Sequence, residues 1–248
     1  MKAPQNNNYA NGNPNGNKGR LIGLPLITLA LAGLAYTVLP AGSESDLSIV
    51  STAQAREGLR IPAPSAPINE PTGQQVAIFA GGCFWGIEGV FDHVKGVISA
   101  ESGYAGGGKA NANYRAVAGG RTRHTEAVRI VYDPSQVSYN ELMRIFFSVG
   151  LDPTQLNRQG PDTGSQYRNA IFPLTKAQAA AARGYLAQLS VNSPWGKKPV
   201  TAIESGSFYR AETVHQNYMA KHPNEPYIRA YDAPKLVNLK RLFPKYYR

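Results

Sequence analysis

One uncharged stretch near the N-terminus, residues 21–40, most constrains how this chain of 248 residues can fold. Its roughly 20 residues are apolar and long enough to cross a bilayer. Lys18 and Arg20 precede it, and the next charged residue is Glu44. A basic flank followed by an apolar run is typical of a signal or anchor segment, so we assign residues 21–41 to targeting rather than to the folded domain.

The charges around this segment also predict where the remainder of the chain lies. Basic flanks stay on the cytoplasmic side, so we expect an extracytoplasmic location: the periplasm, or a membrane anchor facing it. Residues 41–43 and 53–55 both offer small side chains for signal cleavage, while the run is also long enough to remain as an anchor. Both outcomes stay open, and the membrane is expected as a partner only through this N-terminal segment.

Composition divides the rest of the chain. Residues 1–20 are rich in Asn and Gly and are expected to be disordered. Residues 42–73 are rich in Pro, Ser and Ala and are predicted to be a linker. The catalytic domain is expected over residues 74–248. A basic surface accompanies the net charge of +10, but no stripe of interleaved basic and aromatic residues indicates a nucleic-acid partner.

Short apolar runs alternate with amphipathic segments from residue 74 onward. Strands are predicted over 75–80, 97–104, 125–132, 166–173 and 200–204, and helices over 83–94, 139–149, 176–189 and 212–221. Ser138 and Thr175 are the expected N-caps of two of these helices. The alternation favours the α/β class or an α+β sandwich, with a mixed sheet and helices packed on it.

Cys83 is the only cysteine, which excludes an internal disulfide and a cysteine-rich zinc site. The histidines His93, His124 and His222 are not spaced as metal ligands with a carboxylate pair, so we expect no metal and no bound cofactor. Cys83 follows Gly81 and Gly82 and begins a predicted helix, where free backbone N–H groups favour a thiolate and should lower its pKa.

The residues after the cysteine can form a binding surface for a small apolar group. Phe84 and Trp85 are large rings beside the sulfur, and together they could form a cup for a methyl group. Either ring alone would more simply be part of the core.

Five segments follow one another in chain order. They are residues 81–86 (GGCFWG), residues 103–107 with 113–115 (GYAGG, NYR), residues 124–134 (HTEAVRIVYDP), residues 152–168 (DPTQLNRQGPDTGSQYR) and residues 208–218 (FYRAETVHQNY). Together they resemble the motifs of one known family, the A-type peptide methionine sulfoxide reductases. The resemblance covers residues 75–247 and implies a two-layer α+β sandwich of the ferredoxin-like type. It also implies reduction of free or peptide-bound methionine-S-sulfoxide, in the repair of proteins after oxidative damage.

The resemblance assigns roles to seven residues of this chain. Cys83 is the implied nucleophile, which would end as a sulfenic acid, and Glu126 is the implied proton donor to the departing oxygen. The phenols of Tyr114 and Tyr167 are implied to polarise that oxygen. The carboxylate of Asp162 is implied to bind the substrate backbone. The rings of Phe84 and Trp85 are implied to hold the methyl group.

The chain departs from the family pattern in three places. The C-terminal segment 238–248 has no cysteine, so a sulfenic acid on Cys83 would need an external reductant. A thioredoxin-like protein, a glutaredoxin-like protein or a small thiol could serve, and a monomer is expected. Leu151 stands where histidine is common, and residues 213–214 replace an acidic–aromatic pair before His215, which we interpret as a packing residue.

Two other classes of function compete with the reductase. A cysteine hydrolase or acyltransferase would need a histidine near the thiol, for which His215 and His124 are candidates. The second is a catalytically silent, membrane-tethered domain that keeps the fold and binds oxidised peptides without reducing them. The silent domain is disfavoured by the joint presence of Cys83, Glu126, Tyr114 and Tyr167.

Overall fold

The structure is a computed structural model that describes residues 58–248. The expectations for residues 1–20 and 21–41, and for the first part of the linker, lie outside the described residues. Within the described part, no helix is both long and apolar enough to cross a membrane.

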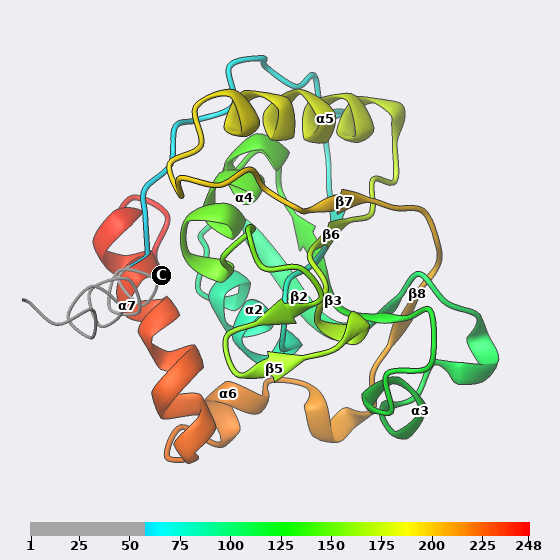
Figure 1. Cartoon of the computed structure of the whole chain (residues 1–248). Coiled ribbons are helices and arrows are strands. Elements are labelled where there is room, and N and C mark those ends of the chain that lie inside the picture. Colours follow the sequence, from blue (N-terminus) through cyan, green and yellow to red (C-terminus); the bar gives the residue numbers. More distant parts are fainter. Residues whose placement is uncertain (1–57) are drawn as a thin grey trace, which may run out of the picture. The chain divides into compact units, whose positions relative to one another are not determined.

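A mixed sheet of six strands forms the centre of the domain (Figure 1). Its spatial order is β7 (Ala202–Ile203), β6 (Ala170–Ile171), β1 (Gln75–Ala80), β3 (Thr125–Tyr132), β2 (Val97–Ala105) and β8 (Phe208–Arg210). The β6–β7 pair is parallel and the other pairs are antiparallel. A separate two-stranded sheet joins β4 (Arg158–Gln159) to β5 (Asp162–Thr163).

Helices of several kinds connect and cover these strands. The α-helices are α2 (Phe84–Asp92), α3 (Tyr114–Ala118), α4 (Tyr139–Ile145), α5 (Lys176–Val191), α6 (Tyr218–Lys221) and α7 (Ala233–Leu242). Three short 3-10 turns are η1 (Lys109–Asn111), η3 (Ser165–Tyr167) and η4 (Thr213–His215), and two π-helical turns are η2 (Phe146–Gly150) and η5 (Ile228–Asp232). The expected α/β class, a mixed sheet with helices packed on it, is confirmed.

The core follows from the two-residue period of β1. Phe79 points into the main apolar cluster, which α2, α4, α5 and α7 share, while Ile78 and Ala80 point into a smaller cluster on the other face. Phe79 stacks on Phe146 with ring centroids 5.0 Å apart. The packing fixes the end of β1, and therefore the position of the residues that follow it.

Residues 58–73 lie along the domain as an ordered strap, seen in cyan beside α5 in Figure 1. Ile61 is 1% exposed, and Leu59 N–H donates to the carbonyl of Ser148 at 3.0 Å. Glu70 accepts hydrogen bonds from the hydroxyl of Tyr132 at 2.6 Å and from the backbone N–H of Tyr139 at 2.9 Å. The described part of the predicted linker is therefore packed on the domain. Contacts with the domain already begin at Leu59, before residue 74.

Three predicted elements of the C-terminal half are shorter than expected. The strand predicted over 200–204 is reduced to β7. The predicted helix over 212–221 is interrupted at Asn217, whose φ is 55°, because the buried side chain of Gln216 hydrogen-bonds both the N–H and the carbonyl of Ser102 on β2. The predicted strand over 166–173 pairs only at β6, since the chain before it turns as η3 after Gly164.

Candidate active site

Cys83 lies where β1 ends and α2 begins, as the N-cap residue of that helix. Gly82 before it has a φ of 85°, and a β-carbon at this position would lie 2.5 Å from the β-carbon of Gln159. Only glycine fits that tight turn. The Cys83 side chain is 8% exposed, so the sulfur lies just below the protein surface.

The electrostatic environment of Cys83 differs from the sequence expectation. Burial raises the pKa of the thiol well above its usual value, and the charges of Glu126 and Asp232 raise it further. The backbone N–H of Trp85 and the charge of Lys235 act in the opposite direction. The helix terminus does favour the thiolate, as expected, but burial and two carboxyl groups outweigh it in the free domain.

Glu126 is held directly beside the start of the same helix. It projects from β3, is 2% exposed, and accepts a hydrogen bond from the backbone N–H of Phe84 at 3.0 Å. Burial raises the pKa of this carboxyl to about 8, the Phe84 N–H lowers it, and Asp162 and Asp232 raise it. A carboxyl group that is neutral near pH 7 can donate a proton to an oxygen atom close to Cys83.

The two phenols of the expected site surround the same region. Tyr114 begins α3, which Asn113 caps by accepting a hydrogen bond from Ala116 N–H. Its pKa is raised by burial and then by the charges of Glu126, Cys83 and Asp162, and that of Tyr167 is raised by burial and by the same three groups. Both hydroxyls therefore remain protonated and able to donate hydrogen bonds.

The two rings that follow Cys83 have different positions. Phe84 is 1% exposed and packs under the site, with ring centroids 5.8 Å from Tyr104 and 5.5 Å from His215. Trp85 is half-buried and stacks on Tyr218 at 3.8 Å with an interplanar angle of 11°. Trp85 thus supplies a wall, and Phe84 supports it from the core.

The opposite side of the site comes from β5 and the C-terminal segment. Asp162 accepts a hydrogen bond from the hydroxyl of Tyr227. Burial raises the pKa of Asp162, while that hydrogen bond and the charge of Lys235 lower it. The Tyr227 ring also meets Trp85 edge to face, with centroids 6.1 Å apart.

Sequence reasoning missed Tyr227, which precedes η5, Asp232 at the end of η5, and Lys235 on α7. A signal for α7 was present, because Asp232 is followed two residues later by Pro234, the usual pairing of an N-terminal residue and a proline in the first turn. The sequence therefore held a signal for the helix, but none for the contacts that bring Asp232 and Lys235 to the site.

Within the described part of the chain, neither candidate histidine for a hydrolase hydrogen-bonds the Cys83 thiol. His215 accepts a hydrogen bond at Nδ1 from the Trp85 indole N–H at 3.3 Å, and burial lowers its pKa. His124 is engaged at Nδ1 by the Gly107 N–H and at Nε2 by the Gly108 carbonyl. Among residues 58–248, no cluster of His, Cys, Asp or Glu side chains is arranged to hold a metal ion.

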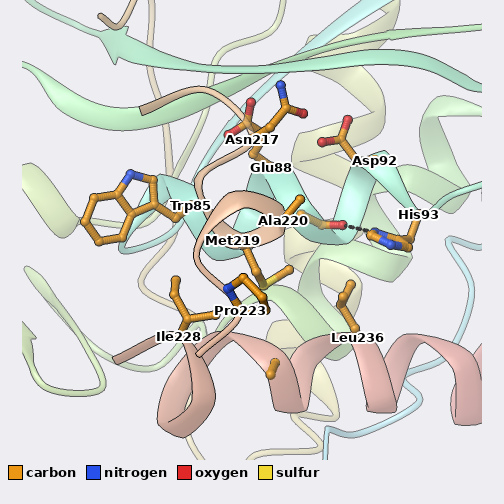
Figure 2. A pocket seen from close by; sticks show the side chains of 12 residues that line it. Trp85, Glu88, Asp92, His93, Asn217, Met219, Ala220, Pro223, Ile228 and Leu236 are labelled. Carbon is orange, nitrogen blue, oxygen red and sulfur yellow. Dashed lines mark hydrogen bonds between the residues drawn. The ribbon is translucent and has the colours of Figure 1, made fainter. Parts of the chain in front are cut away.

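A cavity of about 230 Å³ lies behind Trp85, between α2, α6 and α7 (Figure 2). Its walls are mostly apolar and include Met219, Pro223, Ile228 and Leu236. Cys83 is not among its lining residues, so this cavity adjoins the site without containing the sulfur.

Comparisons with known proteins agree with this arrangement. The family model described as "Peptide methionine sulfoxide reductase" matches residues 75–246. A relative named peptide methionine sulfoxide reductase MsrA 2, from Mesorhizobium japonicum, is 52% identical over 71% of this chain and 90% of its own length. The MsrA of Deinococcus radiodurans is 48% identical over 68% of this chain and 82% of its length.

Two solved structures share the fold. The reduced form of Mxr1 from Saccharomyces cerevisiae matches with a TM-score of 0.56 and 32% identity, over 64% of this chain and 91% of that one. Methionine sulfoxide reductase A of Corynebacterium diphtheriae matches with a TM-score of 0.53 and 33% identity, over 68% of this chain and 90% of that one.

Proposed function

The chain belongs to the peptide methionine sulfoxide reductase family, and from this premise we propose that it reduces free or peptide-bound methionine-S-sulfoxide to methionine. One observation carries the proposal. The buried carboxyl of Glu126, with a pKa of about 8, sits at the first turn of the helix that begins at Cys83. Nucleophile and acid are therefore present together.

The reaction oxidises the cysteine sulfur and reduces the sulfoxide sulfur by the same two electrons. Cys83 attacks the sulfoxide sulfur as a thiolate, and Glu126 donates a proton to the oxygen, which Tyr114 and Tyr167 polarise as charge develops there. The attack forms a sulfur–sulfur bond and releases the protonated oxygen as hydroxide. Addition of hydroxide to the Cys83 sulfur then breaks that bond, so Cys83 becomes a sulfenic acid and methionine leaves with the bonding electron pair. Trp85 and Phe84 form the apolar wall for the methyl group, and Asp162 faces the substrate backbone.

An external thiol completes the cycle. The chain has a single cysteine, so the sulfenic acid of Cys83 cannot form an intramolecular disulfide. A thioredoxin-like protein, a glutaredoxin-like protein or a small thiol supplies the two electrons, and the enzyme works as a monomer without a bound cofactor.

The decisive experiment mixes the protein with a methionine sulfoxide peptide of known epimer and dithiothreitol, and measures methionine. We expect turnover of the S epimer, lost in C83S. Ester or amide cleavage without reductant would support the hydrolase instead, and stoichiometric binding without turnover would support a silent binding domain.

The enzyme acts outside the cytoplasm, held or delivered there by residues 21–41. The uncharged run and the basic residues Lys18 and Arg20 before it support this location. A reporter active only in the periplasm, fused after residue 248, should be active in cells with the full chain. It should lose activity when residues 21–41 are deleted, and activity without that segment would refute the targeting role.

A further inference from the structure

A buried ion pair lies against the first turn of α2. Lys235 Nζ is 3.0 Å from Asp232 Oδ1, and the Asp232 side chain is fully buried while that of Lys235 is 17% exposed. The second carboxylate oxygen of Asp232 has no hydrogen-bond partner among the described residues. None of the steps assigned so far uses this pair.

Gly86 is the residue that lets the pair reach the helix. A β-carbon on Gly86 would lie 2.0 Å from Asp232 Oδ1 and 2.7 Å from Lys235 Nζ, so any side chain there would displace both charges. Gly86 is three residues after Cys83, on the first turn of the helix that the cysteine caps. The π-helical turn η5 ends at Asp232, and such turns occur often at functional sites.

Several ionisable groups from different elements contribute to the electrostatics of the site around Cys83. The carboxyl groups are Glu126 on β3, Asp162 on β5 and Asp232 on η5; the phenols are Tyr114 on α3, Tyr167 on η3, Tyr218 on α6 and Tyr227; and the cation is Lys235 on α7. Lys235 lowers the pKa of both Cys83 and Asp162, and Asp232 raises both. Anionic groups outnumber the cation around this sulfur.

We infer that Lys235 is the counter-charge of the Cys83 sulfur and that Asp232 is the positioning residue that holds it over Gly86. The inference deepens the proposed function and rests on it. The ammonium stabilises the sulfur as a thiolate twice in each cycle, first as the nucleophile and later as a leaving group.

The second of these steps explains why a chain without a resolving cysteine benefits from a cation here. The sulfenic acid of Cys83 condenses with an external thiol, forming a sulfur–sulfur bond and releasing water. A second thiolate then attacks the outer sulfur, the disulfide of the reductant leaves, and the electron pair returns to Cys83 as a thiolate. A leaving thiol departs faster when its pKa is lower, which is what an adjacent cation provides.

Alkylation of Cys83 by iodoacetamide, followed from pH 6 to 10, tests the inference without any sulfoxide. The comparison is between D232N, in which the amide oxygen can still accept the hydrogen bond of Lys235 and hold it in place, and D232N/K235Q, which lacks the lysine. Both lack the buried carboxylate, so the lysine charge is the only difference. We expect alkylation near pH 8 to be about tenfold slower in the double variant, a shift of about one pKa unit for Cys83. Equal profiles would overturn the inference.

Further variants guard against a purely structural explanation. K235R keeps the charge and should retain the wild-type profile more closely than K235Q does. K240Q removes another lysine of α7 and should leave the profile unchanged. Should D232N fail to fold, the K235R and K235Q pair gives the same test, and equal profiles in that pair would again refute the inference.

A turnover measurement separates failure of this inference from failure of the proposed function. Reduction of the oxidised enzyme by dithiothreitol at pH 7 should be several-fold slower in D232N/K235Q than in D232N. An alkylation difference in a protein that reduces no sulfoxide would refute the reductase and leave the charge pairing standing. A protein that reduces sulfoxide, with equal rates of reduction by dithiothreitol in the two variants, would support the reductase and refute the role of Lys235.

Discussion

Glu126 is a carboxyl group whose proton is retained by burial, and its role can be tested by removing only that proton. Glutamine can still accept the Phe84 N–H bond, so we expect E126Q to fold normally. Loss of general acid assistance should slow single-turnover reduction about 10²-fold or more. Rapid mixing with a sulfoxide peptide and quantification of methionine measures this rate. A rate equal to that of the wild type would remove Glu126 from the mechanism.

The pH dependence of the same step is set by Cys83 and Glu126 together. The thiolate fraction of Cys83 increases as pH rises toward its raised pKa, whereas Glu126 donates only below its pKa of about 8. The single-turnover rate should therefore rise up to about pH 8 and level off above it, because the gain in thiolate is then cancelled by the loss of protonated Glu126, with apparent pKa values that belong to the pair. In E126Q the rate should go on rising above pH 8. A wild-type rate that climbs steadily to pH 10 would contradict the assignment.

At this scale the motifs identify residue types but not their electrostatics. Cys83 and Glu126 could be named from the sequence because a glycine turn and a strand motif mark their positions. The raised pKa of Cys83 could not, because it depends on burial and on Asp232, which is about 150 residues away in the chain and reaches the sulfur only through tertiary packing.

Within α2, Glu88 is a second buried carboxyl that the reaction does not use. It is 1% exposed, accepts a hydrogen bond from Ser102 Oγ at 2.8 Å, and burial raises its pKa to about 7. Because folding raises the pKa of Glu88 from about 4.5, protonated Glu88 contributes to the free energy of unfolding fully below pH 4.5, and this contribution is lost as pH rises through 7. A protein with glutamine at position 88 has no such group to ionise, so only the wild type loses this stability.

We therefore expect E88Q to gain stability relative to the wild type as pH rises from 4.5 to 7. The change in the difference of unfolding free energy should be about 2 kcal/mol. Urea denaturation of both proteins at pH 4.5 and pH 7.5 measures it. E101Q, a substitution of a partly exposed glutamate in an ion pair with Arg129, is the control and should show a much smaller change. An E88Q difference that does not vary with pH would contradict the buried titration.

The strap over residues 58–73 should stabilise the domain. Burial of one isoleucine, Ile61, is worth about 1.5–3 kcal/mol, and each hydrogen bond to the Glu70 side chain about 1 kcal/mol, offset by the entropy of ordering the segment. We expect a protein starting at residue 74 to be less stable than one starting at residue 58 by about 2–4 kcal/mol. Thermal denaturation of the two proteins measures this, with I61A in the longer one as a point test. Equal midpoints would show that the strap only rests on the surface.

Elements with a strong local pattern could be predicted, and those shaped by tertiary contacts could not. The bounds of β1 and β3 match the predicted strands at both ends, because their apolar residues follow the period of a strand. Thr175 caps α5 as expected by accepting the Gln178 N–H bond. In contrast, α6 is short because Gln216 is drawn to Ser102 on β2, a contact without any local signature.

The active site as a whole is assembled from widely separated segments around one sulfur. Cys83 follows β1, the acid comes from β3, and the walls come from α3, η3, β5 and the C-terminal η5 and α7. Folding the complete domain is therefore a condition for chemistry. The only redox-active thiol is 8% exposed, which limits its contact with other thiols unless they are brought to this surface.

A single catalytic cycle without reductant should therefore stop at one defined state of the molecule. One equivalent of methionine should form per chain, and Cys83 should carry one added oxygen, because no second cysteine can condense with it. Mass spectrometry after treatment with dimedone should find one adduct per chain, on Cys83, and addition of dithiothreitol before dimedone should abolish the adduct. C83S should form neither methionine nor adduct. Disulfide-linked dimers formed at a rate matching methionine release would instead mean that a second copy of the chain resolves the sulfenic acid, contrary to a monomer regenerated by an external thiol.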